Sequence, residues 1–196
     1  EYYSHPNYRG DDKPSIIHQS SATGMQAIPT TGVAQGIKYK ESLASSNTSE
    51  GGAIVICSLG DAAITEGEVS EAFQFAVLKQ LPIIYLVQDN NWGISVTGEE
   101  ARAMNAFEFA AGFKGMKRVQ VDGSDFAASY LVMKDVCEFV RKERKPCLVH
   151  AQVPLLGHHT SGVRKEFYRT DEDWARHLLH DPHPKLRKNL LEKGVA

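Results

Sequence analysis

The fold is decided by the apolar run Ala53-Ile54-Val55-Ile56-Cys57-Ser58-Leu59 and by a second run, Pro82-Ile83-Ile84-Tyr85-Leu86-Val87-Gln88. Neither run alternates between polar and apolar residues, so both faces of each segment must be covered by other parts of the chain. Such segments are typical of strands in a parallel sheet. We therefore predict two neighbouring parallel strands near 53–59 and 82–88.

The rest of the chain alternates between helical and strand patterns around these two runs. Helical spacing of apolar residues predicts helices at 33–39, 66–80, 104–111 and 125–144. Shorter apolar runs predict two further strands, at 118–121 and 147–151. Because strands alternate with helices, we predict a doubly wound α/β fold with a mainly parallel sheet and helices on both faces.

The length and the apolar content suit one folded unit. The chain has 196 residues, 42% of them hydrophobic, which is enough for a domain with a full core. We expect a single domain over 1–196, with a helical appendage at 171–196 that is interrupted at Pro182 and Pro184. The chain does not begin with Met, and we expect it to be a piece of a longer chain.

Charge and cysteine content restrict the partners and the compartment. Lys and Arg number 22 against 24 Asp and Glu, and this near-neutral balance gives no bulk electrostatic reason to bind nucleic acid. No apolar run reaches the roughly 20 residues that a membrane-spanning helix needs, so we expect no membrane partner. The three cysteines, Cys57, Cys137 and Cys147, form no CxxC pair and predict reduced thiols in a cytoplasmic protein.

Polar side chains follow the first two predicted strands, where ligands of a parallel sheet bind. Asp61 follows the first strand and Asn90 the second, so a carboxylate and an amide oxygen are expected at neighbouring strand ends. Oxygen ligands of this kind, together with phosphate oxygens, suit a magnesium ion that holds a diphosphate. Taken singly, Asp61 is better explained as a helix cap, and Asn90-Asn91 as a turn. The two together favour the metal site.

The same residues carry a resemblance to a known family. Gly60-Asp61, followed about thirty residues later by Asn90-Asn91, resembles the motif that binds thiamine diphosphate. Five longer segments resemble, in order, the alpha chain of 2-oxo acid dehydrogenases: GDAAITEGEVSEAF, LPIIYLVQDNNWGIS, VDGSDFAASY, LLGHHTSG and FYRTDEDW. The Gly-His-His-Thr-Ser run, residues 157–161, is most similar to the branched-chain type.

The resemblance implies a thiamine diphosphate-binding fold and assigns roles to individual residues. It implies metal ligation by the side chains of Asp61 and Asn90 and by the backbone carbonyl of Trp92. The residues it implies around the cofactor, in addition to these three, are Ser21, Thr23, Gly60, Ala62, Ala63, Gln88, Ile94 and His159. The family's aromatic and arginine contacts upstream of this segment are not in the chain.

His159 is the residue that the resemblance marks as catalytic. A histidine with a pKa near neutrality can pass protons during decarboxylation and acyl transfer. Without the resemblance, the pair His158-His159 would be read as a solvated pair in a glycine-flanked loop. Three later histidines, His177, His180 and His183, are interpreted as surface residues because Pro182 interrupts the helix between them.

The implied function is oxidative decarboxylation of a 2-oxo acid that depends on thiamine diphosphate and Mg²⁺, with acyl transfer to a lipoyl partner. A beta-type chain or fused half would supply the glutamate that activates the aminopyrimidine, so we expect an oligomer and no decarboxylation by this chain alone. One alternative keeps the cofactor but uses pyruvate or acetoin. Another is a degenerate, non-catalytic assembly module, which is supported by two departures from the family pattern, Ala62 and Leu155.

Two further expectations concern surfaces and loops. Met25 replaces a threonine oxygen of branched-chain relatives, so we carry over no potassium site. The surface around Met25, Trp92 and 107–113 is expected to form part of an apolar interface with the partner. The loop 153–170 has few apolar side chains to anchor it, and we expect it to be mobile until the cofactor binds.

Overall fold

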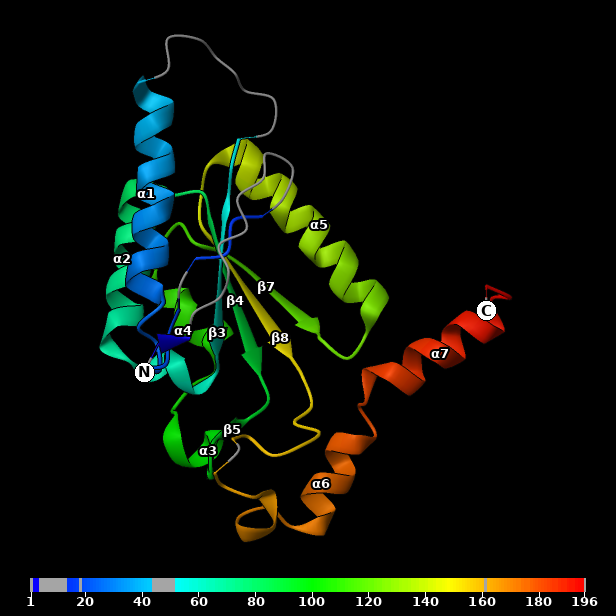
Figure 1. Cartoon of the computed structure of the whole chain (residues 1–196). Helices are drawn as coiled ribbons and strands as arrows, with labels where there is room; N and C mark the ends of the chain where they lie inside the picture. Colours follow the sequence, from blue (N-terminus) through cyan, green and yellow to red (C-terminus); the bar gives the residue numbers. More distant parts are fainter. Residues whose placement is uncertain (1, 4–13, 18, 44–51, 161, 196) are drawn as a thin grey trace.

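Four parallel strands form the central sheet of the computed structural model (Figure 1). They are β3 (Val55–Gly60), β4 (Ile83–Asp89), β7 (Lys117–Asp122) and β8 (Cys147–Gln152), in the spatial order β3-β4-β8-β7. The four strands predicted from the sequence are confirmed, close to their expected bounds.

The structure describes residues 2–3, 14–17, 19–43, 52–160 and 162–195. Most of the irregular N-terminal stretch and most of the polar loop after Leu43, both expected from the sequence, lie outside these ranges. Within the described ranges, no helix is long and apolar enough to cross a membrane.

Helices cover both faces of the sheet, as a doubly wound fold requires (Figure 1). On one face, α1 (Ala27–Leu43) and α2 (Gly67–Lys79) enclose a core with β3 and β4. Phe73 of α2 packs on Tyr85 of β4 with ring centroids 4.5 Å apart. On the other face, Val136 and Val140 of α5 (Phe126–Glu143) pack against β4 and β8. Burial on both faces explains why the strand sequences do not alternate.

Short elements at the carboxyl end of the sheet carry the polar side chains. They are the 3-10 turn η1 (Ala62–Thr65), the hairpin of β5 (Trp92–Gly93) and β6 (Val96–Thr97), α3 (Gly98–Ala101) and α4 (Ala106–Phe109). The remaining small elements are β1 (Tyr2–Tyr3), β2 (Gln19–Ser20), η2 (Ala110–Gly112) and η3 (Lys165–Phe167).

The tail forms two helices, α6 (Asp171–Leu178) and α7 (Pro182–Glu192), which extend away from the sheet (Figure 1). The expected interruption at both prolines is wrong in detail. The break lies before Pro182, which is the first residue of α7, and Pro184 is in the first turn of that helix. Proline is tolerated there because first-turn N–H groups have no partner within a helix.

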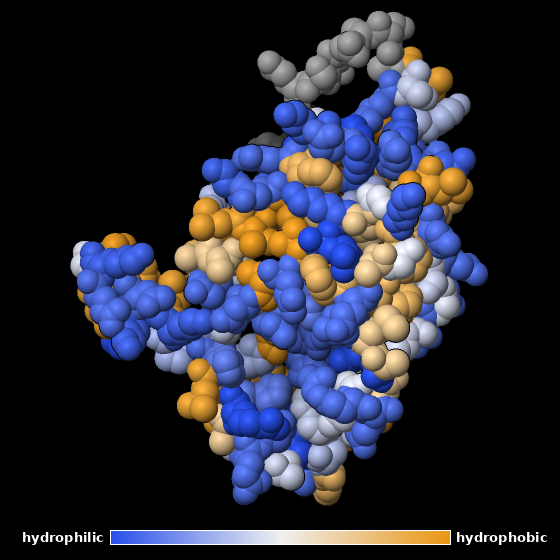
Figure 2. Space-filling model, turned by 180° about the vertical axis from the view of Figure 1, so that it is seen from behind, coloured by the Kyte–Doolittle hydropathy of each residue, from blue (hydrophilic) through white to orange (hydrophobic). Residues whose placement is uncertain are grey.

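The expected apolar interface is corrected at two of its three parts. Trp92 is buried, with its ring 5.4 Å from that of Tyr168, and Phe109 and Phe113 pack on the core beside Phe73. Met25 is 46% exposed, and its part in an interface stays a prediction. The view from behind shows a largely hydrophilic face on which apolar residues gather in separate patches (Figure 2).

Candidate active site

The predicted metal residues lie at the same edge of the sheet. Gly60, the last residue of β3, pairs in register with Gln88 of β4, so Asp61 and Asn90 leave neighbouring parallel strands at their carboxyl ends. Asp61 is buried, with 3% of its surface exposed. A Cβ atom added to Gly60 would meet no atom within 4 Å, so the strand end borders open space.

The segment that precedes α1 also reaches this edge. Gly24 has a φ of +81°, and a Cβ atom there would lie 2.9 Å from the Cβ of Glu66, at the start of α2. Gln26 donates a hydrogen bond through Nε2 to the carbonyl of Ser58 in β3, at 3.0 Å. Ser21 and Thr23, the predicted cofactor contacts, are therefore in a segment tied to the site, and both are exposed.

The residue that departs from the glycine motif, Ala62, is accommodated by the loop across from it. Among the described residues, the non-glycine residues with positive φ are Gln80, Asn91, Ile94 and Arg144, so Ala62 has an ordinary backbone. A Cβ atom added to Gly93 would lie 3.0 Å from the Cβ of Ala62. The methyl group of Ala62 therefore fills space that a side chain at position 93 would otherwise occupy. The neighbouring Ala63 is buried.

The loop after β4 is held by its own side chains. Asn90 Oδ1 accepts the N–H of Trp92 at 2.9 Å, and Asp89 Oδ1 accepts the N–H of Asn91 at 2.9 Å. Asn91 and Ile94 have φ values of 63° and 60°. Asparagine tolerates this region, but a β-branched residue is rarely found there, and such backbone strain clusters at functional sites. Asn90 and Asn91 thus form a turn, as one of the two interpretations predicted. Their part in metal binding stays a prediction.

Gln88 and Ile94, two predicted cofactor contacts, lie on the open side of the site. The side chain of Gln88 is exposed, and its Oε1 accepts a hydrogen bond from the Ser58 hydroxyl at 3.0 Å. Ile94 occupies the two-residue loop between β5 and β6 and is 44% exposed. Both side chains are therefore accessible to a ligand at the strand ends.

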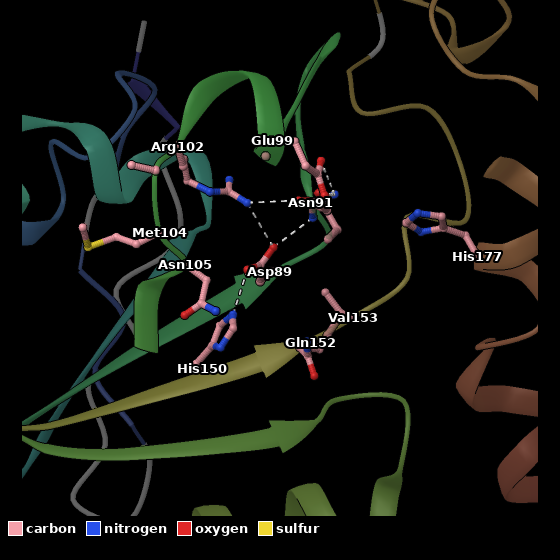
Figure 3. A pocket seen from close by; sticks show the side chains of 13 residues that line it. Asp89, Asn91, Glu99, Arg102, Met104, Asn105, His150, Gln152, Val153 and His177 are labelled. Atoms are coloured by element: carbon pink, nitrogen blue, oxygen red, sulfur yellow. Dashed lines mark hydrogen bonds and ion pairs between the residues drawn. The ribbon is translucent and has the colours of Figure 1, made fainter. Parts of the chain in front are cut away.

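A chain of buried charges joins the ends of three neighbouring strands. Arg102, just after α3, donates through Nη1 to Asp61 Oδ2 and through Nη2 to Asn91 Oδ1 at 3.2 Å. The same Nη2 lies 3.6 Å from Asp89 Oδ1, and His150 Nε2 of β8 lies 2.7 Å from Asp89 Oδ2. Figure 3 shows Arg102 reaching from α3 toward Asp89 and Asn91, with His150 on the opposite side of Asp89.

The two carboxylates of this chain differ in acidity. Burial raises the pKa of Asp61 above its usual value, the negative charge of Asp89 raises it further, and Arg102 opposes both effects. Burial also acts to raise the pKa of Asp89, but hydrogen bonds from His150 and the Asn91 N–H, with the charge of Arg102, bring it below its usual value. Asp89 is therefore the more firmly ionised of the two.

Four residues of the charge chain, Asp89, Asn91, Arg102 and His150, line a cavity of about 480 Å³ at this end of the sheet, and Asp61 is not among the described residues that line it. His150 Nδ1 faces no hydrogen-bond partner in the described part of the chain, although the residue is only 1% exposed. The other lining residues include Asn90, Glu99, Asn105, Gln152 and His177 (Figure 3).

The histidine loop follows β8 and is held at its start by Arg169 and by two residues of α6, Trp174 and His177. Leu155 donates its N–H to His177 Nδ1 at 2.9 Å, and its carbonyl accepts from Arg169 Nη1 at 2.6 Å. Trp174 Nε1 donates to the Leu156 carbonyl at 3.4 Å. His177 is thus a half-buried structural residue, and its interpretation as a surface residue is wrong.

The predicted catalytic residue, His159, is exposed. His158 beside it accepts the N–H of Lys165 through Nδ1 at 3.1 Å. Among the described residues, none forms a hydrogen bond with His159, so its ring is available to a ligand.

The sequence reading missed four residues of the site and the histidine loop: Asp89, Arg102, His150 and Arg169. No motif marks them, because each acts on a partner brought close only by the fold. A weak signal existed for two of them. An arginine within a short polar segment after the Asn-Asn loop, and a histidine within an otherwise apolar strand, both require a buried partner.

Comparison with known proteins places this site in a family. Residues 3–196 match the family model described as dehydrogenase E1 component. The 3-methyl-2-oxobutanoate dehydrogenase subunit alpha of Mycobacterium tuberculosis is 34% identical over 72% of this chain and 39% of that protein. The mitochondrial 2-oxoisovalerate dehydrogenase subunit alpha of Mus musculus is 32% identical over 72% of this chain and 32% of that protein.

A relative that covers more of the chain is the pyruvate dehydrogenase E1 component subunit alpha of Staphylococcus aureus. It is 28% identical over 98% of this chain and 51% of that protein. The chain thus spans about half the length of this relative, and less of the two above.

Solved structures agree on the fold. Transketolase from Campylobacter jejuni matches with a TM-score of 0.58 and 25% identity, over 69% of this chain and 20% of that chain. Transketolase from Leishmania mexicana matches with a TM-score of 0.60 and 14% identity, over the same 69% of this chain. With the family match over 3–196 and these relatives, the chain belongs to the dehydrogenase E1 component family and is similar to alpha chains of 2-oxo acid dehydrogenases.

Proposed function

We propose that this chain is the diphosphate-binding, alpha-type part of an enzyme that decarboxylates a 2-oxo acid with thiamine diphosphate and Mg²⁺. The observation that carries the proposal is that Asp61 and the loop of Asn90 and Trp92 follow neighbouring parallel strands at one edge of the sheet, in a member of the dehydrogenase E1 component family. The acyl group would pass to a lipoyl arm on a partner protein.

The residues present fit the proposed metal and diphosphate. A carboxylate, an amide oxygen and a backbone carbonyl form the hard oxygen set that Mg²⁺ prefers. The open space beside Gly60 leaves room for a diphosphate at the strand end. The described residues contain no group of three or more His, Cys, Asp or Glu side chains suited to a metal, so this mixed oxygen set is the better candidate.

When bound, thiamine diphosphate supplies the carbanion that attacks the 2-oxo carbon and the electron sink for the departing carbon dioxide. In our proposal, Asp61, Asn90 and the Trp92 carbonyl hold the metal, and Ser21, Thr23 and Gln88 contact the cofactor. Gly60, Ala62, Ala63 and Ile94 shape the backbone around it. His159, which is exposed, moves protons and stabilises charge near the reacting centre.

The substrate is a separate part of the proposal, because one thiamine diphosphate chemistry can serve several substrates. We propose a branched-chain 2-oxo acid, because the relatives from Mycobacterium tuberculosis and Mus musculus at 34% and 32% identity carry names of that type. The runner-up is pyruvate, supported by the coverage of 98% of this chain by the Staphylococcus aureus relative. Acetoin is a third possibility within the same chemistry. Rates with the three substrates decide between them.

The partners follow from the same proposal. A beta-type chain or fused half would supply the activating glutamate, and an acyltransferase would present the lipoyl group. We expect an oligomer on these grounds. We also propose a cytoplasmic location, because all three cysteines are free, and burial raises the pKa of the Cys57 thiol to about 11.

A non-catalytic assembly module is the alternative from another class. Its two supports are weak, since Gly93 makes room for Ala62, and the backbone of Leu155 is held by Arg169. The charge chain and the exposed His159 favour an enzyme.

The test is to assay the chain alone and assembled with its beta-type partner. With thiamine diphosphate, Mg²⁺ and a 2-oxo acid, we expect no decarboxylation by the chain alone and turnover by the assembly. His159→Asn should lower kcat by about a hundredfold in the assembly, the usual contribution of a general acid or base. Equal rates for His159→Asn and the wild type would contradict the assignment, and full turnover by the chain alone would contradict the need for a partner.

A further inference from the structure

The buried carboxylate of Asp61 depends on a single cation in the metal-free chain. The Asp61 and Arg102 side chains are 3% and 7% exposed, and Arg102 is the one cation that contacts Asp61 within the described ranges. A buried carboxylate without a partner costs several kcal/mol, so this ion pair explains how Asp61 remains inside the fold. It also means that one of the two carboxylate oxygens, Oδ2, is already occupied.

A divalent metal and a guanidinium compete for one buried carboxylate. If Asp61 binds a metal, Arg102 in its present position faces a double positive charge a few ångströms away, in a region of low dielectric constant. The single negative charge of the carboxylate does not offset the repulsion between the metal ion and the guanidinium. Metal binding therefore favours a position of Arg102 farther from Asp61.

A second set of partners is already in place for Arg102. Its Nη2 donates to Asn91 Oδ1 at 3.2 Å and lies 3.6 Å from Asp89 Oδ1 (Figure 3). Asp89 is held by His150 at 2.7 Å, so it stays in position as an acceptor. A small rotation of the guanidinium would exchange Asp61 for Asp89 without leaving any charge unpaired.

The segment that carries Arg102 has few apolar anchors. Arg102 is the residue just after α3, a helix of four residues, and it precedes Met104, which is 47% exposed. On the other side of α3, Val96 is 42% exposed. Low apolar burial of this kind marks segments that shift at little cost.

We propose that Arg102 is an exchangeable counter-ion of the metal site. It neutralises Asp61 in the metal-free chain and releases the carboxylate to the divalent cation, moving onto Asp89 and Asn91. Arg102 is then a positioning residue, because it acts on the metal through Asp61. The inference rests on the proposed function in one respect, the role of Asp61 as a metal ligand.

The experiment measures divalent metal affinity in the assembled enzyme, with thiamine diphosphate present, by counting bound Mn²⁺ with electron spin resonance. Arg102→Gln removes the competitor, so we expect Mn²⁺ to bind on the order of tenfold more tightly than to the wild type. The melting temperature of the metal-free Arg102→Gln assembly should fall, and saturating Mn²⁺ should raise it more than it raises that of the wild type. A purely structural arginine would not tighten metal binding.

Three variants serve as controls. Arg102→Lys keeps the cation, and Arg141→Gln removes an exposed arginine from the last turn of α5, far from the strand ends. Both should bind Mn²⁺ within about twofold of the wild type. Asp89→Asn removes the charged acceptor that would receive Arg102, so Arg102 should remain on Asp61 and weaken Mn²⁺ binding about threefold.

The outcomes separate the inference from the proposed function. Mn²⁺ binding to Arg102→Gln that equals or is weaker than that of the wild type overturns the inference and leaves the metal site intact. If Arg102→Gln does not fold, Asp89→Asn decides, and unchanged Mn²⁺ affinity in that variant overturns the inference. If Asp61→Asn binds Mn²⁺ as the wild type does, the metal assignment fails, and the exchange fails with it.

Discussion

Ala62 and Gly93 form a matched pair at the scale of single residues. One carries a methyl group where the thiamine diphosphate motif usually has glycine, and the other leaves space for that methyl group. We expect Gly93→Ala to destabilise the fold by about 1 kcal/mol, because its Cβ would lie 3.0 Å from that of Ala62. The free energy of unfolding in urea measures this cost.

The matched control for this pair is the double variant. Ala62→Gly combined with Gly93→Ala should recover most of the lost stability, since the two methyl groups then no longer meet. Additive costs in the double variant would show that the two positions are independent and would contradict the pairing.

The sequence predicted some site residues and not others, for a physical reason. Asp61 and Asn90 follow from a rule on strand ends, which needs only the position of two apolar runs. Asp89 and His150 lie 61 residues apart and pair through the register of β4 with β8, which the sequence does not reveal. Arg102 lies 41 residues after its partner Asp61, and no motif in the sequence marks that pairing.

At the scale of elements, α6 acts as a clamp on the start of the histidine loop. The expectation of a weakly held loop considered apolar anchors only. The structure adds three side-chain hydrogen bonds from His177, Arg169 and Trp174 to the backbone of Leu155 and Leu156. The mobility of the loop beyond this clamp stays a prediction.

The clamp predicts how stability depends on pH. Burial lowers the pKa of His177 below its usual 6.5, as do the positive charges of Arg169, Arg176 and His180, and Asp173 opposes them. The pKa of His177 is lower in the folded chain than in the unfolded chain. The neutral ring therefore contributes its full stabilisation at a pH above the pKa of the unfolded chain. That stabilisation is lost as the pH falls through the pKa of the folded chain. Nδ1 accepts the Leu155 N–H only when it is unprotonated.

We therefore expect stability to decrease as the pH falls below the usual histidine pKa of 6.5, and His177→Gln to flatten that part of the curve. The variant should lose about 1 kcal/mol at pH 7.5 through the missing hydrogen bond. Thermal melting at a series of pH values measures both effects, with His183→Gln on α7 as the matched control. A wild-type slope retained in His177→Gln would contradict the role of this ring.

The clamp also predicts where proteases reach the loop. Cleavage near Arg164-Lys165 should slow when thiamine diphosphate and Mg²⁺ are added to the assembled enzyme. Arg169→Met should speed cleavage, because the Leu155 carbonyl loses its donor. Cleavage rates that do not respond to the cofactor would argue against a loop ordered by it.

At the scale of the whole molecule, the sequence predicted the layers well. Continuous apolar runs predict buried parallel strands, and the alternation of strands with helices predicts the doubly wound arrangement. The length of α1 was underestimated, because Thr30, Thr31 and Ala34 are small and give little periodic signal although all are buried. The inward position of Trp92 was missed, because its ring packs against Tyr168 from a distant segment.

The central claim is that Asp61 holds a metal on which the cofactor depends. The direct test is calorimetric titration of thiamine diphosphate into the assembled enzyme, with and without Mg²⁺, for the wild type, Asp61→Asn and Asp122→Asn. Asp122, at the end of β7, is a matched aspartate at the same edge of the sheet. We predict Mg²⁺-dependent binding that Asp61→Asn weakens at least about a hundredfold and Asp122→Asn leaves unchanged. Equal Mg²⁺-dependent affinity in Asp61→Asn and the wild type would contradict the account.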